Sequence, residues 1–432
     1  MIEMYNKTLK ETIYKEILDN GLTVYLCRKK DYKLKQAVFS VDFGGNDIEF
    51  IPYNSNEYYK APLGVAHFLE HKLFTKEDGS DVMEDFSKLG CSSNAYTTDI
   101  RTSYYFSGTN NFKEALILLL DFVQTPHFTD ESVERERGII EQEILNYVDN
   151  PYSVIDKNLL MSLYEKNGIR NDVGGTVESI QEITKEVLDL CYKTFYHPKN
   201  MSLSVVGDFD VNEILEIVKE NQNSKTFLEY KNPNSIVYRE EMKVFKKKTE
   251  IEFDVNVPLV EVGLKLPALN NLSSKEVCKR YFSYAMLIDQ SFYDISDFYQ
   301  KMLEKGIFNN SFECYSSFSE DYSYLKLFCE TEKYNEFIEC VVNRLNLIRT
   351  IDFTKEDFYF LKRCYLAEQI NSYSSVSALA FLADSLHENY QDINDIIDSI
   401  KELTYEEVLL ARKDFIDDAI SICILKSNNS EQ

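Results

Sequence analysis

Two histidines four residues apart are the most chemically informative feature of this sequence. His67 and His71 belong to the run HFLEH at positions 67–71, which also contains Glu70. Four residues slightly exceed one helical turn, so on a helix both imidazoles lie on one face and can bind one metal ion. The 432 residues include only five histidines. Chance would therefore produce this pattern only about 0.005 times per chain, which makes it a specific signal.

The residue types in this run fit hydrolysis assisted by zinc. Neutral imidazole is a good zinc ligand, and a catalytic zinc site needs three protein ligands and one open position. Zinc activates water near neutral pH, and a carboxylate such as Glu70 can take the proton and later deliver it to a leaving amine. The order H-x-x-E-H is a known catalytic zinc motif. The alternative is an amphipathic helix in which both histidines only pack or form hydrogen bonds.

A third ligand can be sought in the acidic segment 130–149. Its apolar spacing predicts a long helix that begins at Thr129 or Asp130. Glu136 and Glu143 are seven residues apart, so they lie on the same stripe of that helix. Glu143 would complete a His-His-Glu site, and Glu136 could then hydrogen-bond a ligand imidazole. From these residues alone, the commoner interpretation is that both glutamates are solvated surface charges.

Several collinear runs together resemble the pitrilysin/insulinase family of zinc peptidases, which includes the mitochondrial processing peptidases. They are HFLEH at 67–71, GCSSNAYT at 90–97, ERGIIEQE at 136–143, GGTVESI at 174–180 and FYHPKNMSLSVVGD at 195–208. The resemblance covers residues 15 to 215 and is nearest to small bacterial members. It implies that His67, His71 and Glu143 bind one zinc ion per chain. It also implies catalytic roles for Glu70 as general base and Glu136 as supporting acid.

The same resemblance assigns a substrate-binding role to residues 92–98. In the family this segment is an exposed edge strand, and an extended peptide can add to such a strand through main-chain hydrogen bonds. Asn94 would be the polar residue nearest the scissile bond. Ala95 would leave room for the peptide backbone, and Ser93 would lie beside it. Alternatively, Asn94 only turns the chain.

The chain is long enough for two domains, and its 44% apolar and 28% charged residues are typical of a globular protein. We predict a catalytic zinc-binding domain at 1–222, a linker at 223–248 and a non-catalytic homologous domain at 249–432. The order of predicted strands and helices is α+β in both halves. The resemblance implies two tandem αβ-roll domains, each an antiparallel sheet packed with helices, that form half of a clam-shell chamber.

Several elements can be placed along the chain. In the first half, strands are expected at 21–26, 37–43 and 202–206. In the second half, an alternating run spans 251–266, a helix is expected from about Ser274 to Lys305, and strands are expected at 312–318, 322–329 and 419–425.

Charge and cysteine content indicate the kind of binding partner and the cellular location. The formal net charge of −25 argues against a nucleic-acid partner; it favours basic peptides by steering, or serves solubility alone. Nine cysteines without a C-x-x-C pair indicate reduced thiols and a cytoplasmic location. The N-terminus lacks the apolar core of a signal peptide. The longest apolar run, near 115–120, is too short to span a membrane.

The second half lacks the metal-binding residues of the first. Residues 281–289, where a second metal-binding helix would fall, contain no histidine. Family members also carry an arginine and a tyrosine that stabilise the oxyanion. The nearest run here, MLEKGIFNNSF at 302–312, has methionine or leucine and asparagine instead. Losing such donors can cost about 10²–10³ in kcat. The resemblance therefore implies a heterodimer in which a homologous partner chain supplies Arg and Tyr; a homodimer is the alternative.

These expectations combine into one predicted function. The chain is expected to be a zinc metallopeptidase, a hydrolase that cleaves oligopeptides or leader peptides internally. Two alternatives of another class stay open. One is a core scaffold subunit without activity, although such relatives typically lose part of the H-x-x-E-H motif. The other is a peptide-binding subunit that holds zinc without turnover.

Overall fold

The computed structural model describes residues 1–294, 296–350, 352–388 and 393–427. Grouped by their contacts, these residues form two compact units. Unit 1 contains Met1–Ile144, Asp172–Ile236 and Ala367–Ile396; unit 2 contains Leu145–Asn171, Val237–Leu366 and the residues from Ile397 onward. Each unit thus includes a helical segment from the other half of the chain. The predicted boundaries 1–222, 223–248 and 249–432 divide the chain along its sequence, whereas these units are grouped by contacts. The boundaries therefore stay a prediction.

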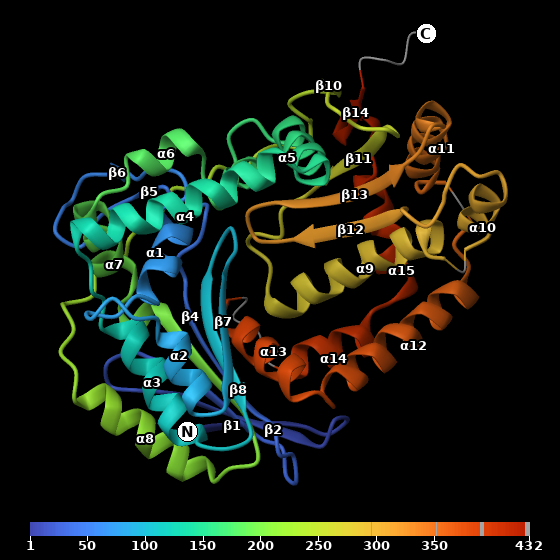
Figure 1. The fold of residues 1–432 in the computed structure, drawn as a ribbon. Helices are drawn as coiled ribbons and strands as arrows, with labels where there is room; N and C mark the ends of the chain where they lie inside the picture. Colours follow the sequence, from blue (N-terminus) through green and yellow to red (C-terminus); the bar gives the residue numbers. More distant parts are fainter. Residues whose placement is uncertain (295, 351, 389–392, 428–432) are drawn as a thin grey trace. The chain divides into compact units, whose positions relative to one another are not determined.

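Unit 1 is built on a seven-stranded sheet (Figure 1). In spatial order its strands are β1 (Ile2–Asn6), β2 (Glu11–Ile17), β3 (Thr23–Arg28), β9 (Met201–Gly207), β4 (Lys35–Val41), β8 (Thr102–Gly108) and β7 (Cys91–Thr97). β3 and β9 are parallel, and the other neighbours are antiparallel. A small hairpin of β5 (Glu49–Phe50) and β6 (Tyr59–Lys60) lies outside this sheet.

Unit 2 is built on a five-stranded sheet that repeats this plan. Its strands, in spatial order, are β10 (Lys248–Glu252), β14 (Ile420–Lys426), β11 (Leu259–Leu266), β13 (Ser323–Glu330) and β12 (Glu313–Phe318). β10 and β14 are parallel and the rest antiparallel, as for β3-β9-β4-β8-β7. The two sheets therefore share strand order and direction, which confirms the predicted α+β fold with two tandem domains. β7 and β12 are equivalent edge strands.

Helices cover both faces of the first sheet. Alternate residues of β4 face opposite ways. Ala37, Phe39 and Val41 join a large apolar core with helices α1 (Val65–Leu73), α3 (Phe112–Gln124), α7 (Lys185–Phe195) and α8 (Val211–Asn223). On the opposite face lies α13 (Val376–Glu388), from the second half of the sequence (Figure 1). There Asp384 accepts hydrogen bonds from Ser40 and Ser202 and pairs with Arg101.

In unit 2, helix α5 (Pro151–Leu163) packs on the sheet, with Leu159 close to Gly263 of β11. The remaining helices are α2 (Val82–Lys88), α4 (Asp130–Val148) and α6 (Val177–Gln181) in the first half, and α9 (Ser274–Phe292), α10 (Asp297–Glu304), α11 (Tyr334–Leu347), α12 (Lys355–Ser372), α14 (Ile393–Glu402) and α15 (Tyr405–Ala411) in the second. All nine cysteines are free thiols. Among the described residues, no helix is both long and apolar enough to cross a membrane.

Two expected elements of the second half are wrong in extent. The alternating run 251–266 is two strands, because β10 and β11 lie on opposite sides of β14 and run in opposite directions. The chain must leave the sheet between them, and Pro258, which has no N–H group, stands there. Strands at 313–318, 323–330 and 420–426 agree with expectation within a few residues.

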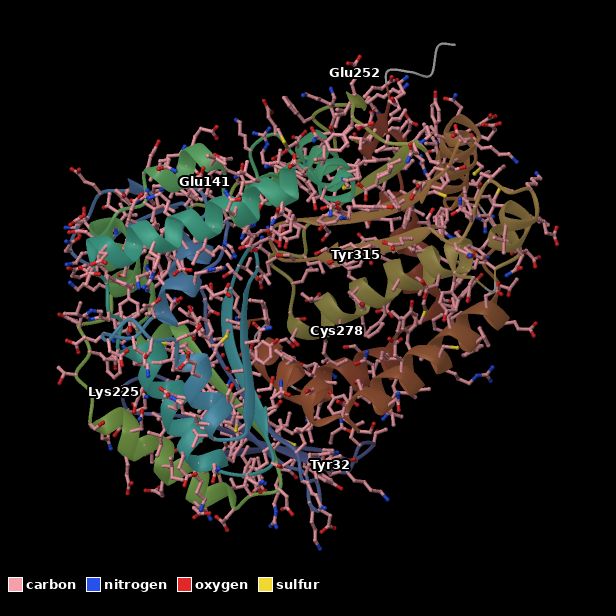
Figure 2. The ribbon with its side chains drawn as sticks, in the orientation of Figure 1. Tyr32, Glu141, Lys225, Glu252, Cys278 and Tyr315 are labelled. Carbon is pink, nitrogen blue, oxygen red and sulfur yellow. The ribbon has the colours of Figure 1, made fainter. Side chains whose placement is uncertain are left out.

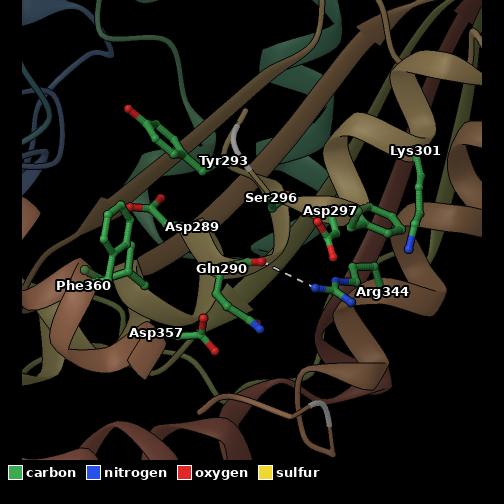
Figure 3. A pocket seen from close by; sticks show the side chains of 11 residues that line it. Asp289, Gln290, Tyr293, Ser296, Asp297, Lys301, Arg344, Asp357 and Phe360 are labelled. Atoms are coloured by element: carbon green, nitrogen blue, oxygen red, sulfur yellow. Dashed lines mark hydrogen bonds between the residues drawn. The ribbon is translucent and has the colours of Figure 1, made fainter. Parts of the chain in front are cut away.

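The expected helix from Ser274 to Lys305 is also broken, into α9 and α10. Ser296 ends the break by capping α10: its side chain accepts a hydrogen bond from the N–H of Tyr299 at 3.1 Å. Residues at the break line a cavity of about 520 Å³ within unit 2, in which Arg344 donates to the backbone carbonyl of Gln290 at 3.5 Å (Figure 3). The Ser296 cap therefore sets the start of α10 as a separate helix.

Candidate metal centre

Helix α1 carries the two histidines and Glu70. It begins after Gly64, whose φ is 88°. A Cβ atom on Gly64 would lie 2.5 Å from the carbonyl oxygen of Gly174, so glycine allows the loop at 174–175 to approach the start of the helix. Phe68 and Leu69 are buried in the core, which fixes the face that His67 and His71 present.

Helix α4 carries the two glutamates, as the expected helix at 130–149 predicted. Arg137 of this helix is 9% exposed, and its side chain donates to three backbone carbonyls: those of Ile180 at 2.8 Å, Gln181 at 2.9 Å and Ile183 at 3.1 Å. These bonds hold α4 against the end of α6 and the residues just after it, and so place Glu136 and Glu143 in unit 1.

The structure brings His67, His71 and Glu143 together. One ligand atom from each lies within 4.8 Å of the others. The Nε2 atoms of His67 and His71 lie 3.9 and 3.5 Å from Oε2 of Glu143. Tetrahedral zinc with bonds near 2.0–2.1 Å separates its ligand atoms by about 3.3 Å, so the cluster needs only small adjustments to hold such an ion. Their assignment as ligands stays a prediction that this geometry supports.

The surroundings of the histidines differ. Nδ1 of His71 lies 3.2 Å from Oε1 of Glu136, the arrangement that orients a ligand imidazole. Burial opposes protonation of His71, but the Glu136 hydrogen bond and the charges of Glu70, Glu136 and Glu143 outweigh it and raise its pKa. For His67, burial and then His71 lower the pKa to about 4. Without a metal, His67 is thus a neutral donor near neutral pH, the form that binds metals.

Glu70 is 8% exposed and lies at the edge of the cluster. Its Oε2 atom accepts a hydrogen bond of 2.5 Å from the hydroxyl of Thr97, at the end of β7. Burial raises the pKa of Glu70, while the Thr97 hydrogen bond and His71 lower it. The Thr97 hydroxyl also lies 3.3 Å from the hydroxyl of Thr102. Thr102 in turn donates to the carbonyl of Phe43 at 2.9 Å. The general-base candidate is therefore held by a chain of polar contacts that runs from the half-buried Thr97 to the buried Thr102.

The predicted substrate-binding residues lie on β7, the last strand of its sheet. This confirms that the segment is an edge strand. Asn94, together with Glu70 and His71, lines a cavity of about 370 Å³. Its side-chain oxygen accepts from the N–H of Ala95 at 2.9 Å. Ala95 packs against the core, and Ser93 pairs with Phe106 of β8. Their binding roles stay predictions.

Two supporting residues have no role in the sequence-based expectation: Thr97 and Arg137. Both stand inside runs that carry the family resemblance, so they were visible as residues. Their partners are a side chain 27 positions away and three carbonyls 43 to 46 positions away. No local pattern encodes such contacts.

Two family profiles match this chain, one after the other along the sequence. The profile of the insulinase family, peptidase family M16, matches residues 55–177. The profile described as the M16 peptidase inactive domain matches residues 182–364. The chain is 36% identical over 428 residues to the uncharacterized zinc protease YmfH of Bacillus subtilis, covering 96% of each. It is 29% identical over 160 residues to the mitochondrial-processing peptidase subunit beta of Rattus norvegicus, covering 36% of this chain and 33% of that one.

Solved structures agree with this result. A crystal structure of an M16-like peptidase from Alicyclobacillus acidocaldarius superposes with a TM-score of 0.91 at 30% identity, covering 97% of this chain and 99% of the other. A protease from Helicobacter pylori, 19% identical, has the same fold with a TM-score of 0.80 over 96% of this chain and 99% of that one. Similarity at this level extends along nearly the whole sequence. The chain therefore belongs to the insulinase family of peptidases, family M16.

Proposed function

We propose that this protein is a zinc-dependent endopeptidase that binds one zinc ion per chain through His67, His71 and Glu143. The observation that carries the proposal is the convergence of these three side chains from α1 and α4 beside the buried carboxylate of Glu70. A zinc ion there would supply a Lewis acid and activate water for attack on a peptide carbonyl. Homologues named zinc proteases support this chemistry.

The protein's own residues divide the remaining work. Glu70 accepts the proton of the attacking water and delivers it to the leaving amine. Glu136 orients His71, and Thr97 holds one oxygen of Glu70 so that the other stays available. A peptide adds to the open edge of β7 as a further strand, close to Asn94 and the neighbouring cavity.

The proposal includes a partner chain. The run 302–312 lacks the arginine and tyrosine that the resemblance leads one to expect, and a relative is itself named as one subunit, beta, of a peptidase. We propose that a homologous chain supplies these groups in a heterodimer that encloses a chamber; the alternative is a homodimer. A cytoplasmic location is part of the same proposal. The missing donors equally favour a second candidate, a peptide-binding subunit that holds zinc without turnover.

The test is digestion of a defined peptide mixture by the zinc-loaded chain, with products read by mass spectrometry. We expect Glu70→Gln to abolish cleavage while zinc content stays near one ion per chain. Glu143→Gln should lower zinc retention under dialysis. Glu141→Gln, on the same helix (Figure 2) but outside the cluster, is the matched control. Cleavage that survives Glu70→Gln would disprove the assigned mechanism, and unchanged zinc content in Glu143→Gln would remove that ligand.

The two candidates are separated by adding a homologous chain that carries the arginine and tyrosine. Cleavage that appears only in the mixture, and that Glu70→Gln abolishes, supports the heterodimer. Strong cleavage by the chain alone contradicts it and supports self-sufficiency. Zinc and peptide binding without cleavage under either condition favours the non-catalytic candidate.

A further inference from the structure

Another cavity, of about 420 Å³, lies in unit 2, and none of its lining residues belongs to the proposed catalytic machinery. It is bounded by the first turns of α5 and by the neighbouring strands β11, β13 and β12. Its lining includes Tyr152 and Asp156 from α5, Glu261, Glu313, Lys326 and Phe328. Tyr152 is 51% exposed, so the cavity opens to solvent.

Glu261 is the unusual residue of this cavity. It is only 4% exposed, and its Oε2 atom is buried without a hydrogen-bond partner among the described residues. Burial, and then the charge of Glu313, raise the pKa of Glu261 to about 8. A buried carboxylate normally has a cation or several donors beside it. Here the Oε2 atom of a carboxyl group that lines a cavity has no such partner among the described residues.

The strand register places a second carboxylate in the same row. Glu261 of β11 pairs with Phe328 of β13, and Phe328 pairs with Glu313 of β12. Residues paired directly across strands point to the same face, so both carboxylates flank the Phe328 ring with backbones about 10 Å apart. A positive group above that ring would lie between two carboxylates.

The cation already present does not neutralise this row. The ammonium of Lys326 is in contact with the carboxylate of Asp156, and it lies 5.1 Å from the ring centre of Tyr315. Its charge is therefore balanced by Asp156, while Glu261 and Glu313 have no ion pair among the described residues. Tyr315 on β12 is exposed and labelled in Figure 2.

Aromatic rings complete the surroundings. The ring of Tyr152 lies 5.7 Å from that of Phe328, and Tyr315 lines the cavity from the edge strand. Aromatic faces attract ammonium groups, and more strongly where water is excluded. A cavity lined by carboxyl groups and aromatic rings is suited to bind an alkylammonium ion.

We propose that the cavity between α5 and the second sheet binds a primary ammonium group of a peptide, held by Glu261 and Glu313 over Phe328. The group is either a lysine side chain or a free amino terminus. This site is separate from the metal centre, and its occupancy does not depend on whether the chain hydrolyses peptides.

The test compares three ten-residue peptides of alanine, glycine and serine, by calorimetric titration of full-length Glu70→Gln protein, which prevents cleavage. The first is acetylated and carries one central lysine; the second has norleucine in its place; the third has norleucine and a free amino terminus. Because hydrogen bonds to charged groups are stronger than those between neutral groups, we expect the ammonium peptides to bind about tenfold more tightly than the second. Whether the first, the third or both show the gain identifies the source of the ammonium.

Adding Glu261→Gln should remove most of that gain, while Glu339→Gln, an exposed glutamate of α11 outside the cavity, should keep it. Equal affinity for all three peptides, or a gain that persists in Glu261→Gln, overturns the proposal. Circular dichroism checks that Glu261→Gln folds. If it does not, Glu313→Gln on the exposed edge strand replaces it, with the same expected loss and the same refuting result.

Discussion

At the residue scale, the short contact between Thr97 and Glu70 gives the two oxygens of the proposed base different surroundings. Oε2 accepts the Thr97 hydroxyl at 2.5 Å, while the Glu70 side chain also lines the cavity beside His71. A carboxylate held at one oxygen keeps a fixed orientation, and proton transfer depends on that orientation. Thr97 is therefore a positioning residue in the proposed reaction.

Replacing Thr97 by valine keeps the shape of the side chain and removes its hydroxyl. We expect kcat to fall about tenfold or more, because a hydrogen bond to a charged group is worth roughly 1.5–3 kcal/mol. KM and zinc content should change little, and Thr97→Ser should restore most of the rate. Steady-state kinetics and metal analysis measure these quantities. A Thr97→Ser variant as slow as Thr97→Val would instead indicate that packing of the methyl group matters.

Glu261 makes a second prediction at this scale, for stability against pH. Its folded-state pKa is raised to about 8 by burial, above the ordinary value near 4.3 of an unfolded chain. Between these values the folded state binds the extra proton, so its contribution to stability falls as the pH rises from about 4.5 to 8. The Glu261→Gln variant has no such dependence. The difference between its free energy of unfolding and that of the unmodified chain should therefore shift in favour of the variant by a few kcal/mol across that range.

Urea denaturation of both proteins at pH 5 and pH 8.5 measures this change. Glu339→Gln, which alters an exposed carboxylate, should follow the unmodified chain at both pH values. A constant difference between Glu261→Gln and the unmodified chain would show that Glu261 does not retain its proton on folding.

At the scale of elements, the metal centre depends on how two helices are held. His67 and His71 are on α1, Glu143 is on α4, and no hydrogen bond within either helix sets the distance between them. Arg137 fixes α4 through three carbonyls of the segment 180–183. Gly64 and Gly175 let the loop at 174–175, which leads into α6, approach the start of α1. One segment therefore positions both helices.

Replacing Arg137 by lysine keeps the charge but loses the planar fork that reaches several carbonyls. We expect zinc affinity to fall about tenfold and the thermal midpoint to drop, since unpaired buried carbonyls cost roughly 1–3 kcal/mol. Competition with a chelator and thermal unfolding measure these effects. Arg135→Lys, the same substitution at an exposed position of α4, should retain zinc normally. Equal zinc affinity in both variants would mean that α4 is held by its apolar face alone.

At the scale of the whole molecule, the charge of −25 creates a negative potential that attracts basic peptides. If the protein is a peptidase, kcat/KM for a peptide with several lysines should fall several-fold as salt rises from about 20 to 200 mM, because screening shortens the reach of charge. A neutral peptide of equal length should be affected little. Initial rates at several salt concentrations test this. Equal salt dependence for both peptides would assign the charge to solubility alone.

The sequence by itself determined the elements whose patterns are local. HFLEH at 67–71 and the helix at 130–148 were readable because helical spacing fixes which side chains share a face. The α+β order was likewise predictable, whereas the edge strand at 92–98 was expected from the family resemblance. The sequence runs also carried the family resemblance on which Glu143 depended.

Only the tertiary structure decided which distant groups meet. It split the run 251–266 into strands on both sides of β14, and it broke the helix 274–305 at Ser296. It placed α13 against the first sheet and α5 against the second. It also brought Thr97 to Glu70, Arg137 to residues 180–183, and Glu261 into line with Glu313. Such contacts arise from the packing of segments far apart in the chain, and packing is a property of the whole fold rather than of any local pattern.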